Sequence, residues 1–156
     1  MTSADSTEHF AGALVRAILE GESDAIIGSD RDGMIAFWNQ GAQRVFGYSA
    51  AEAVGQSLDI IIPERLRDAH WKGYSEVMGT GRSRYGSGDL LTVPGIRKDG
   101  QRISLEFTIV PLSDAEGHMA GMAAILRDVT ARFEELKTLR RRLAEVNRLA
   151  PAIPSA

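Results

Sequence analysis

The sequence predicts an α+β fold built around one antiparallel sheet. Two short apolar strands near the N-terminal end meet at Asp32-Gly33, a dipeptide that strongly favours a β-hairpin. Several short helices with recognisable caps follow, and the second half of the chain contains three longer strands. Strands that precede and follow a group of helices in this order are typical of an antiparallel sheet with segregated helices.

The composition is that of an ordinary soluble domain. The chain has 156 residues, of which 44% are hydrophobic and 25% charged, so it can bury a core without disulfide or metal. It contains no cysteine, which excludes a disulfide framework, a thiolate metal site, a cysteine nucleophile and cysteine-dependent flavin photochemistry. With a net charge of −3, no apolar run of membrane length and no signal peptide, we expect a cytoplasmic protein with no nucleic-acid or membrane partner.

The chain opens with an amphipathic helix over residues 7–20, for which Ser6 or Thr7 is a candidate cap. Four apolar residues share one face of this helix: Phe10, Leu14, Ala17 and Ile18. That face packs either on its own domain or on a second copy of the chain, and the sequence leaves both alternatives open.

Strands at 24–29 and 34–38 form the first hairpin. Asn39 then suits the N-cap of a short helix that ends at Gly47, and Ser49 with Glu52 forms a capping box for the next helix. A longer helical pattern runs from Glu64 to Met78. Along it, Leu66, His70, Tyr74 and Val77 or Met78 recur on one face.

The second half is predicted as strands at 89–97, 101–112 and 119–127, the first two joined by a Lys98-Asp99-Gly100 turn. In the middle strand, apolar residues alternate with polar ones, so one of its faces should be buried. The residues expected to point inward are Ile103, Leu105, Phe107 and Ile109, together with alternate residues of the last strand that include Met122.

From Asp128 the chain is predicted to be helical to about Leu149. Its apolar residues recur at the a and d spacing of a coiled coil: Val129, Leu136, Leu139, Leu143, Val146 and Ala150. The seam spans about three heptads, which is marginal for a lone helix, so we expect a homodimer that uses both terminal helices. The arginines 140, 141, 142 and 148 favour a solvated face over an anion-binding surface.

Three segments carry a resemblance to a known family: DAIIGSDRDGMIAFWNQGAQRVFGYSAAEAVGQSLDIIIPE, IRKDGQRISLEFTIVPL and GMAAILRDVTARFEE. In this order they resemble a PAS (Per-Arnt-Sim) domain over residues 22–131. The resemblance implies a five-stranded antiparallel sheet with short helices on one face, around a pocket that holds haem, flavin, a small metabolite or nothing. It divides the chain into an N-terminal helix (1–21), the PAS domain (22–131), a signalling helix (132–150) and a frayed tail (151–156).

PAS domains rarely perform chemistry; they pass a change to an output domain or a partner. The sequence likewise lacks a nucleophile elbow and a phosphate-binding loop. We therefore expect a non-enzymatic, stand-alone sensing and dimerisation module. It would relay a ligand-dependent change to an unknown protein such as a kinase or regulator.

The segment IIPERLRDAHWKGY resembles the haem-binding helix of PAS domains in bacterial oxygen sensors. The resemblance implies that His70 is the axial ligand of haem b iron. It also implies that Phe107 and Ile109 close over bound gas from the sheet. The helical spacing puts Leu66 and Tyr74 on the His70 side of the pocket, and the strand alternation puts Met122 on the sheet side. Two loop residues, Arg82 and Arg84, would pair with the haem propionates.

One stretch departs from that pattern. The oxygen sensors place arginine or methionine just after the glycine-rich loop, where this chain has Asp89-Leu90-Leu91. Loss of an arginine that hydrogen-bonds bound oxygen should weaken oxygen binding more than carbon monoxide or nitric oxide binding. The alternatives are a ligand-free interaction module in which His70 is a packing residue, and a sensor of an apolar metabolite.

Overall fold

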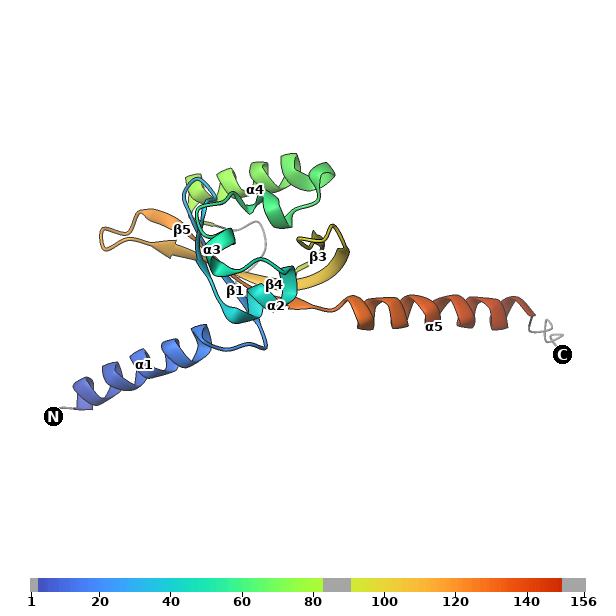
Figure 1. Ribbon diagram of the computed structural model, residues 1–156, viewed down its shortest axis with the longest axis horizontal. Helices are drawn as coiled ribbons and strands as arrows, with labels where there is room; N and C mark the ends of the chain where they lie inside the picture. The colour runs from blue at the N-terminus through green and yellow to red at the C-terminus, as the bar shows by residue number, and fades with distance from the viewer. Residues whose placement is uncertain (1–2, 83–90, 150–156) are drawn as a thin grey trace, which may run out of the picture.

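The computed structural model describes residues 3–82 and 91–149. Its elements follow the predicted order of two strands, a group of short helices and three strands (Figure 1). They are α1 (Ser3–Leu19), β1 (Ala25–Asp30), β2 (Ile35–Trp38), α2 (Gln40–Phe46), α3 (Ala50–Ala53), η1 (Leu58–Ile61), η2 (Glu64–Leu66), α4 (Arg67–Thr80), β3 (Leu91–Ile96), β4 (Arg102–Ser113), β5 (Met119–Asp128) and α5 (Thr130–Leu149).

The five strands form one antiparallel sheet in the order β2-β1-β5-β4-β3. The N-terminal hairpin therefore joins the sheet through β1, which pairs with the last strand, β5. Because α1 leads into β1 and α5 follows β5, this pairing brings the C-terminal end of α1 and the N-terminal end of α5 to adjacent strands. The predicted α+β fold with one antiparallel sheet is confirmed.

One face of the sheet carries the core, and the short helices cover that face. Leu105 on β4 and Leu126 on β5 are buried there, as the alternation of apolar residues predicts. Phe46 of α2 and Tyr74 of α4 belong to the same apolar cluster. The helices of the central segment thus lie over the face that a pocket would occupy.

Two local caps predicted from the sequence are present. The Asn39 side chain accepts from the Ala42 amide at the start of α2, and Ser49 and Glu52 form a reciprocal capping box at α3. The predicted caps Ser6 and Thr7 are wrong, because α1 already begins at Ser3. An apolar periodicity defines a face of a helix but not the turn at which the helix begins.

The predicted helix from Glu64 to Met78 is divided. Residues 64–66 form a 3₁₀ turn after Pro63, and the α-helix begins at Arg67. The Arg67 guanidinium donates to the carbonyls of Ile62 and Asp59, at the end of η1, where the Asp59 carbonyl also accepts from the Ile62 amide. These bonds stabilise a change of direction just before α4.

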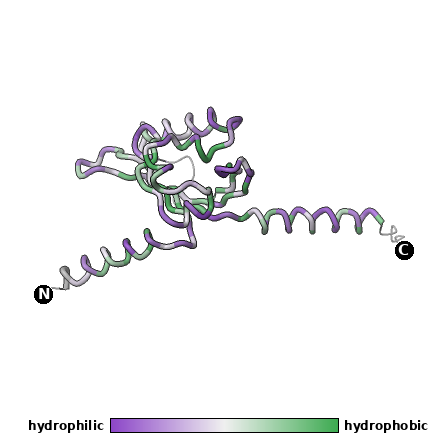
Figure 2. Tube along the Cα trace, in the orientation of Figure 1, coloured by the Kyte–Doolittle hydropathy of each residue, from purple (hydrophilic) through white to green (hydrophobic). Residues whose placement is uncertain are grey.

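The two terminal helices extend away from the sheet (Figure 1). On α1, the side chains of Phe10, Leu14 and Ile18 are 69%, 49% and 50% exposed, and α5 has no buried residue. Apolar and polar residues alternate along both helices (Figure 2). In the two stretches that the structure describes, no helix combines the length and apolarity needed to cross a membrane.

Candidate functional site

Helix α4 is held to the sheet by the hydroxyl of Tyr74. This hydroxyl donates to the carbonyl of Asp30 and lies 2.9 Å from Ser29 Oγ. Ser29 Oγ in turn lies 3.4 Å from the Met122 carbonyl, so one buried network joins α4, β1 and β5. Burial raises the pKa of Tyr74 and keeps its hydroxyl protonated.

Trp71 fastens the same helix to the first hairpin and to η1. Its indole Nε1 donates to Asp59 Oδ1 at 2.8 Å. Its ring covers the turn at Gly33, where a Cβ would lie 2.2 Å from the ring carbons. The α4 backbone is therefore fixed by one polar and one steric contact at this point.

His70 lies beside both of these residues, half-buried on the side of α4 that carries Tyr74. Its ring centroid is 4.8 Å from that of Trp71 and 5.8 Å from that of Tyr74. Its Nδ1 is buried and has no hydrogen-bond partner among the described residues. Burial lowers the pKa of His70 against the opposing effect of Asp59, so the imidazole is neutral at physiological pH.

The sheet contributes four further predicted site residues. Met122 is buried in the core cluster that contains Tyr74, and Phe107 and Ile109 are half-buried against it. Leu91 begins β3 directly opposite Phe107 and is half-buried. Because directly opposed residues share a sheet face, Leu91 and Phe107 point to the same side.

Of the remaining four predicted site residues, two lie outside the core cluster and two lie outside the described residues. Leu66 ends the 3₁₀ turn and is half-buried, and Arg82 is exposed just beyond α4. In the described part of the chain, the core cluster includes neither of them. Arg84 and Leu90 lie outside the described residues.

Sequence reasoning missed Ser29 and Asp59, which orient Tyr74 and Trp71. A signal for Ser29 was available, because it continues the inward alternation of Ala25 and Ile27 in β1. No sequence signal pointed to Asp59, since its contact with Trp71 joins two separate helices, η1 and α4.

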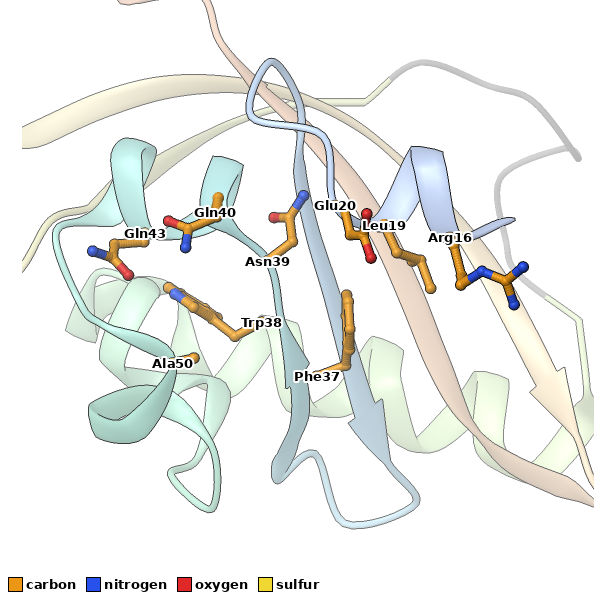
Figure 3. A pocket seen from close by; sticks show the side chains of 9 residues that line it. All are labelled: Arg16, Leu19, Glu20, Phe37, Trp38, Asn39, Gln40, Gln43 and Ala50. Atoms are coloured by element: carbon orange, nitrogen blue, oxygen red, sulfur yellow. The ribbon is translucent and has the colours of Figure 1, made fainter. Parts of the chain in front are cut away.

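An open recess of about 390 Å³ lies elsewhere, where the end of α1 passes β2 and α2 (Figure 3). Its lining shares no residue with the predicted site: Arg16, Leu19, Glu20, Phe37, Trp38, Asn39, Gln40, Gln43 and Ala50. Trp38 Nε1 donates to the Tyr48 carbonyl, and the Asn39 amide donates to the carbonyls of Gly21 and Asp24. These polar atoms are used by the fold, so the recess is a weaker candidate site than the side of α4 that carries His70.

Known proteins match nearly the whole chain. A family model described as the PAS fold matches residues 13–129. Sensor protein FixL of Bradyrhizobium diazoefficiens is 30% identical over 94% of this chain and 30% of its own length. Oxygen sensor protein DosP of Escherichia coli is 26% identical over 96% of this chain and 18% of its own length. The chain thus spans less than a third of these curated relatives.

Solved structures share the fold. The PAS domain of a protein from Colwellia psychrerythraea has a TM-score of 0.66 and 23% identity, over 76% of this chain and 97% of that one. An RNA-binding light-oxygen-voltage receptor has a TM-score of 0.67 and 24% identity, over 92% of this chain and 40% of that one. With the family model over most of the chain, these likenesses confirm the predicted resemblance: the protein belongs to the PAS family and contains a sensor domain related to signal-sensing proteins.

Proposed function

We propose that this chain is a PAS sensing and dimerisation module whose ligand is haem b, with His70 as the axial ligand of the iron. The observation that carries the proposal is the buried, unpartnered Nδ1 of His70 among the described residues. A neutral imidazole in an apolar setting has the donor chemistry that haem iron binds. The similarity to proteins named as an oxygen sensor and a sensor protein supports the same choice.

The residues around His70 fit this role through their polarity and position. Tyr74 directs its only polar atom to Ser29 and Asp30, which leaves its ring as an apolar surface beside His70. From the sheet, Phe107, Ile109 and Met122 present apolar side chains on the core face. These apolar side chains would line the haem pocket, and the burial of His70 itself lowers its pKa and favours the neutral imidazole.

Haem would supply an iron with one position open to a diatomic gas. The propionates would be held by Arg82 and Arg84, and Leu66 would cover the ring beside His70. With Leu90 and Leu91 in place of a hydrogen-bonding side chain, the proposed sensor discriminates against oxygen and favours carbon monoxide or nitric oxide.

We also propose how the signal leaves the domain. Residues 22–131 would form the sensing unit, and the two terminal helices would form a homodimer interface in the cytoplasm. A change at the pocket would reach α5 from the sheet, because the Val129 amide donates to the Ser104 carbonyl and the Ser104 amide donates to Thr130 Oγ1. The output would pass to a partner protein such as a kinase or regulator.

The packing of the core supports a second candidate, a ligand-free interaction module. Tyr74, Val77 and Met78 of α4 share one apolar cluster with Ile103 and Leu105 of the sheet. If these side chains fill the interior, His70 is a packing residue against two aromatic rings. The terminal helices would then bind a partner without a ligand signal.

An absorption spectrum separates the two candidates. The protein is expressed with a haem precursor, purified, and compared with His70→Ala and with His118→Ala, a control at an exposed histidine. A Soret band in the wild type and in His118→Ala, but not in His70→Ala, is expected. A wild type that takes up no haem would favour the ligand-free module, and full haem occupancy in His70→Ala would exclude His70 as the ligand.

A second variant tests the proposed gas preference. Leu91 lies beside Phe107 on the inner face of the sheet, so Leu91→Arg would introduce a hydrogen-bond donor there. We expect the ratio of oxygen to carbon monoxide affinity to rise about ten-fold or more, which corresponds to one charge-assisted hydrogen bond of about 1.5–3 kcal/mol. Thr92→Arg, on the exposed side of the same strand, should leave the ratio unchanged.

A further inference from the structure

An exposed apolar seam runs along α5. It consists of Leu136, Leu139, Leu143 and Val146, whose side chains are 43%, 51%, 62% and 62% exposed. The helix extends beyond the body of the domain (Figure 1). The preceding d position of the heptad is Arg132, whose charge would oppose a copy of itself, so the apolar seam begins one turn later, at Leu136.

The residues that flank the seam carry a charge pattern. With Leu136 and Leu143 at a positions, Glu135 and Arg142 occupy g, and Arg140 and Asn147 occupy e. Among the described residues, neither Glu135 nor Arg140 forms an ion pair within its own chain. Both side chains are exposed and border the seam.

We propose that α5 pairs with α5 of a second copy as a parallel, in-register two-stranded coil, oriented by Glu135 of each copy facing Arg140 of the other. In a parallel coil, a g residue meets the e residue five positions later on the partner helix. The two-fold axis makes this ion pair twice. The proposal rests on the homodimer proposed above and adds its interface, orientation and register.

The opposite orientation brings like charges together. An antiparallel pairing that overlaps all four seam residues has Leu136 opposite Val146 and Leu139 opposite Leu143, and therefore centres on Arg141. It places Arg140 beside Arg140 of the second copy, and Arg142 beside Arg142 of the second copy. Flanking charges set the orientation of coiled coils, so the charges of α5 favour the parallel arrangement.

Charge reversal tests the pair. Glu135→Arg alone puts arginine against arginine, and Arg140→Glu alone puts glutamate against glutamate. We expect each single variant to weaken dimerisation at least ten-fold in sedimentation equilibrium, and the double variant to return to within about three-fold of the wild type. Arg141→Glu, which reverses a charge on the outer face of the same turn, is the matched control and should have little effect.

Mixing the double variant with the wild type provides an independent measurement of orientation. In a parallel coil, the mixed dimer sets arginine against arginine on one side and glutamate against glutamate on the other, so each protein should pair with itself. In an antiparallel coil, position 140 of one copy faces position 140 of the other, and the mixed dimer gains an Arg–Glu pair there. It would then form in preference to both homodimers. We expect all variants to keep the fold, because the changed residues are exposed. Circular dichroism checks this.

Orientation is read directly with one introduced thiol, since the chain has no cysteine. Val146→Cys should form an intermolecular disulfide under mild oxidation in the parallel coil. In the antiparallel coil the two thiols are separated by ten residues, or ~15 Å along the axis, which is too far for a disulfide. Arg148→Cys, on the outer face, is the control.

The outcomes separate this inference from the homodimer on which it rests. A dimer that is insensitive to both charge reversals, and whose Val146→Cys variant does not cross-link, overturns the parallel α5 pairing but leaves the homodimer standing. A wild type that is monomeric at tens of micromolar overturns both. Charge rescue in the double variant together with a cross-link in the Val146→Cys variant supports the pairing.

Discussion

At the scale of single residues, the side of α4 that carries His70 is organised by side chains that direct their polar atoms elsewhere. Tyr74 bonds to β1, and Trp71 bonds to Asp59. His70 packs against both rings, with its Nδ1 buried and unpartnered among the described residues. An unpaired buried nitrogen is costly to the fold, and such groups are typical of sites that bind a ligand.

The lowered pKa of His70 predicts a pH dependence of stability in the haem-free protein. Burial disfavours the charged ring, so between the folded-state pKa and the unfolded value of 6.5 the unfolded chain binds more protons. The contribution of the neutral ring is therefore complete above pH 6.5 and is lost progressively as the pH falls below it. Urea unfolding between pH 8 and pH 5 should show this loss.

Variants of two histidines show whether His70 causes that loss of stability. His70→Phe keeps an aromatic ring but cannot titrate, so the fall in unfolding free energy below pH 6.5 should become shallower. His9→Ala removes an exposed histidine and should keep the wild-type profile. If His70→Phe shows the same pH profile as the wild type, His70 is not the group that causes the loss.

Gly33 offers a second test at the residue scale. Its φ is +76°, and a Cβ there would meet the Trp71 ring at 2.2 Å. Gly100 has φ +84° with nothing within 4 Å of a Cβ, so Gly100→Ala measures backbone strain alone, about 1–2 kcal/mol. Gly33→Ala should lower the free energy of unfolding by more than Gly100→Ala does.

A double-mutant cycle identifies the source of the difference. If the Trp71 ring causes the additional loss, Gly33→Ala should become about as costly as Gly100→Ala in the background of Trp71→Ala. Equal losses for the two alanine variants in the wild-type background would mean that the ring moves aside at no cost.

At the scale of elements, β4 shows both how the core is built and what a pocket would need. Its inward residues pass from buried Ile103 and Leu105 to half-buried Phe107 and Ile109. The half-buried end lies opposite Leu91 and the start of β3. Phe107 and Ile109, the ligand residues proposed on β4, thus belong to the less enclosed part of the core face, whereas Met122 on β5 is buried.

Truncation of Phe107 distinguishes a filled interior from a cavity. If neighbouring side chains pack around it, Phe107→Ala should lower the free energy of unfolding by ~3–5 kcal/mol. Val110→Ala, at a residue that is 49% exposed on the other face of β4, should change stability by less than about 0.5 kcal/mol. Chemical denaturation measures both, and a Phe107→Ala loss well below that range, with new ligand uptake, would indicate a pre-existing cavity.

The elements were largely predictable from the sequence, because each has a local cause. The alternation in β4, the Asn39 cap and the Ser49–Glu52 box depend on residues close together in the chain. The contacts that surround His70 were not predictable, because Ser29 and Asp59 are 45 and 12 residues from their partners. The periodicity of apolar residues also could not show that a 3₁₀ turn follows Pro63 and that α4 begins only at Arg67.

At the scale of the whole molecule, hydrogen bonds link the segment that follows α1 to the end of β5, which precedes α5. Arg127, near the end of β5, forms two hydrogen bonds to the Asp24 carboxylate at 2.7 and 3.0 Å. Arg44 of α2 donates to the carbonyls of Glu22 and Ser23 in the same linker. The segment that joins α1 to the sheet and the segment that joins the sheet to α5 are therefore held close together. Both helices extend from this part of the domain.

The last prediction concerns α1, whose apolar face is left exposed by the described residues. Phe10, Leu14 and Ile18 are each about half exposed or more, and burying one such side chain contributes about 1.5–3 kcal/mol. If this face lies in the homodimer interface, Leu14→Glu enters the interface twice by symmetry. Dimerisation should then weaken at least ten-fold, as measured by light scattering across a concentration series. His9→Glu, which lies away from that face of the helix, adds a charge without touching it and should leave the dissociation constant unchanged. A Leu14→Glu dimer as tight as the wild type would remove α1 from the interface and leave α5 as the remaining candidate for it.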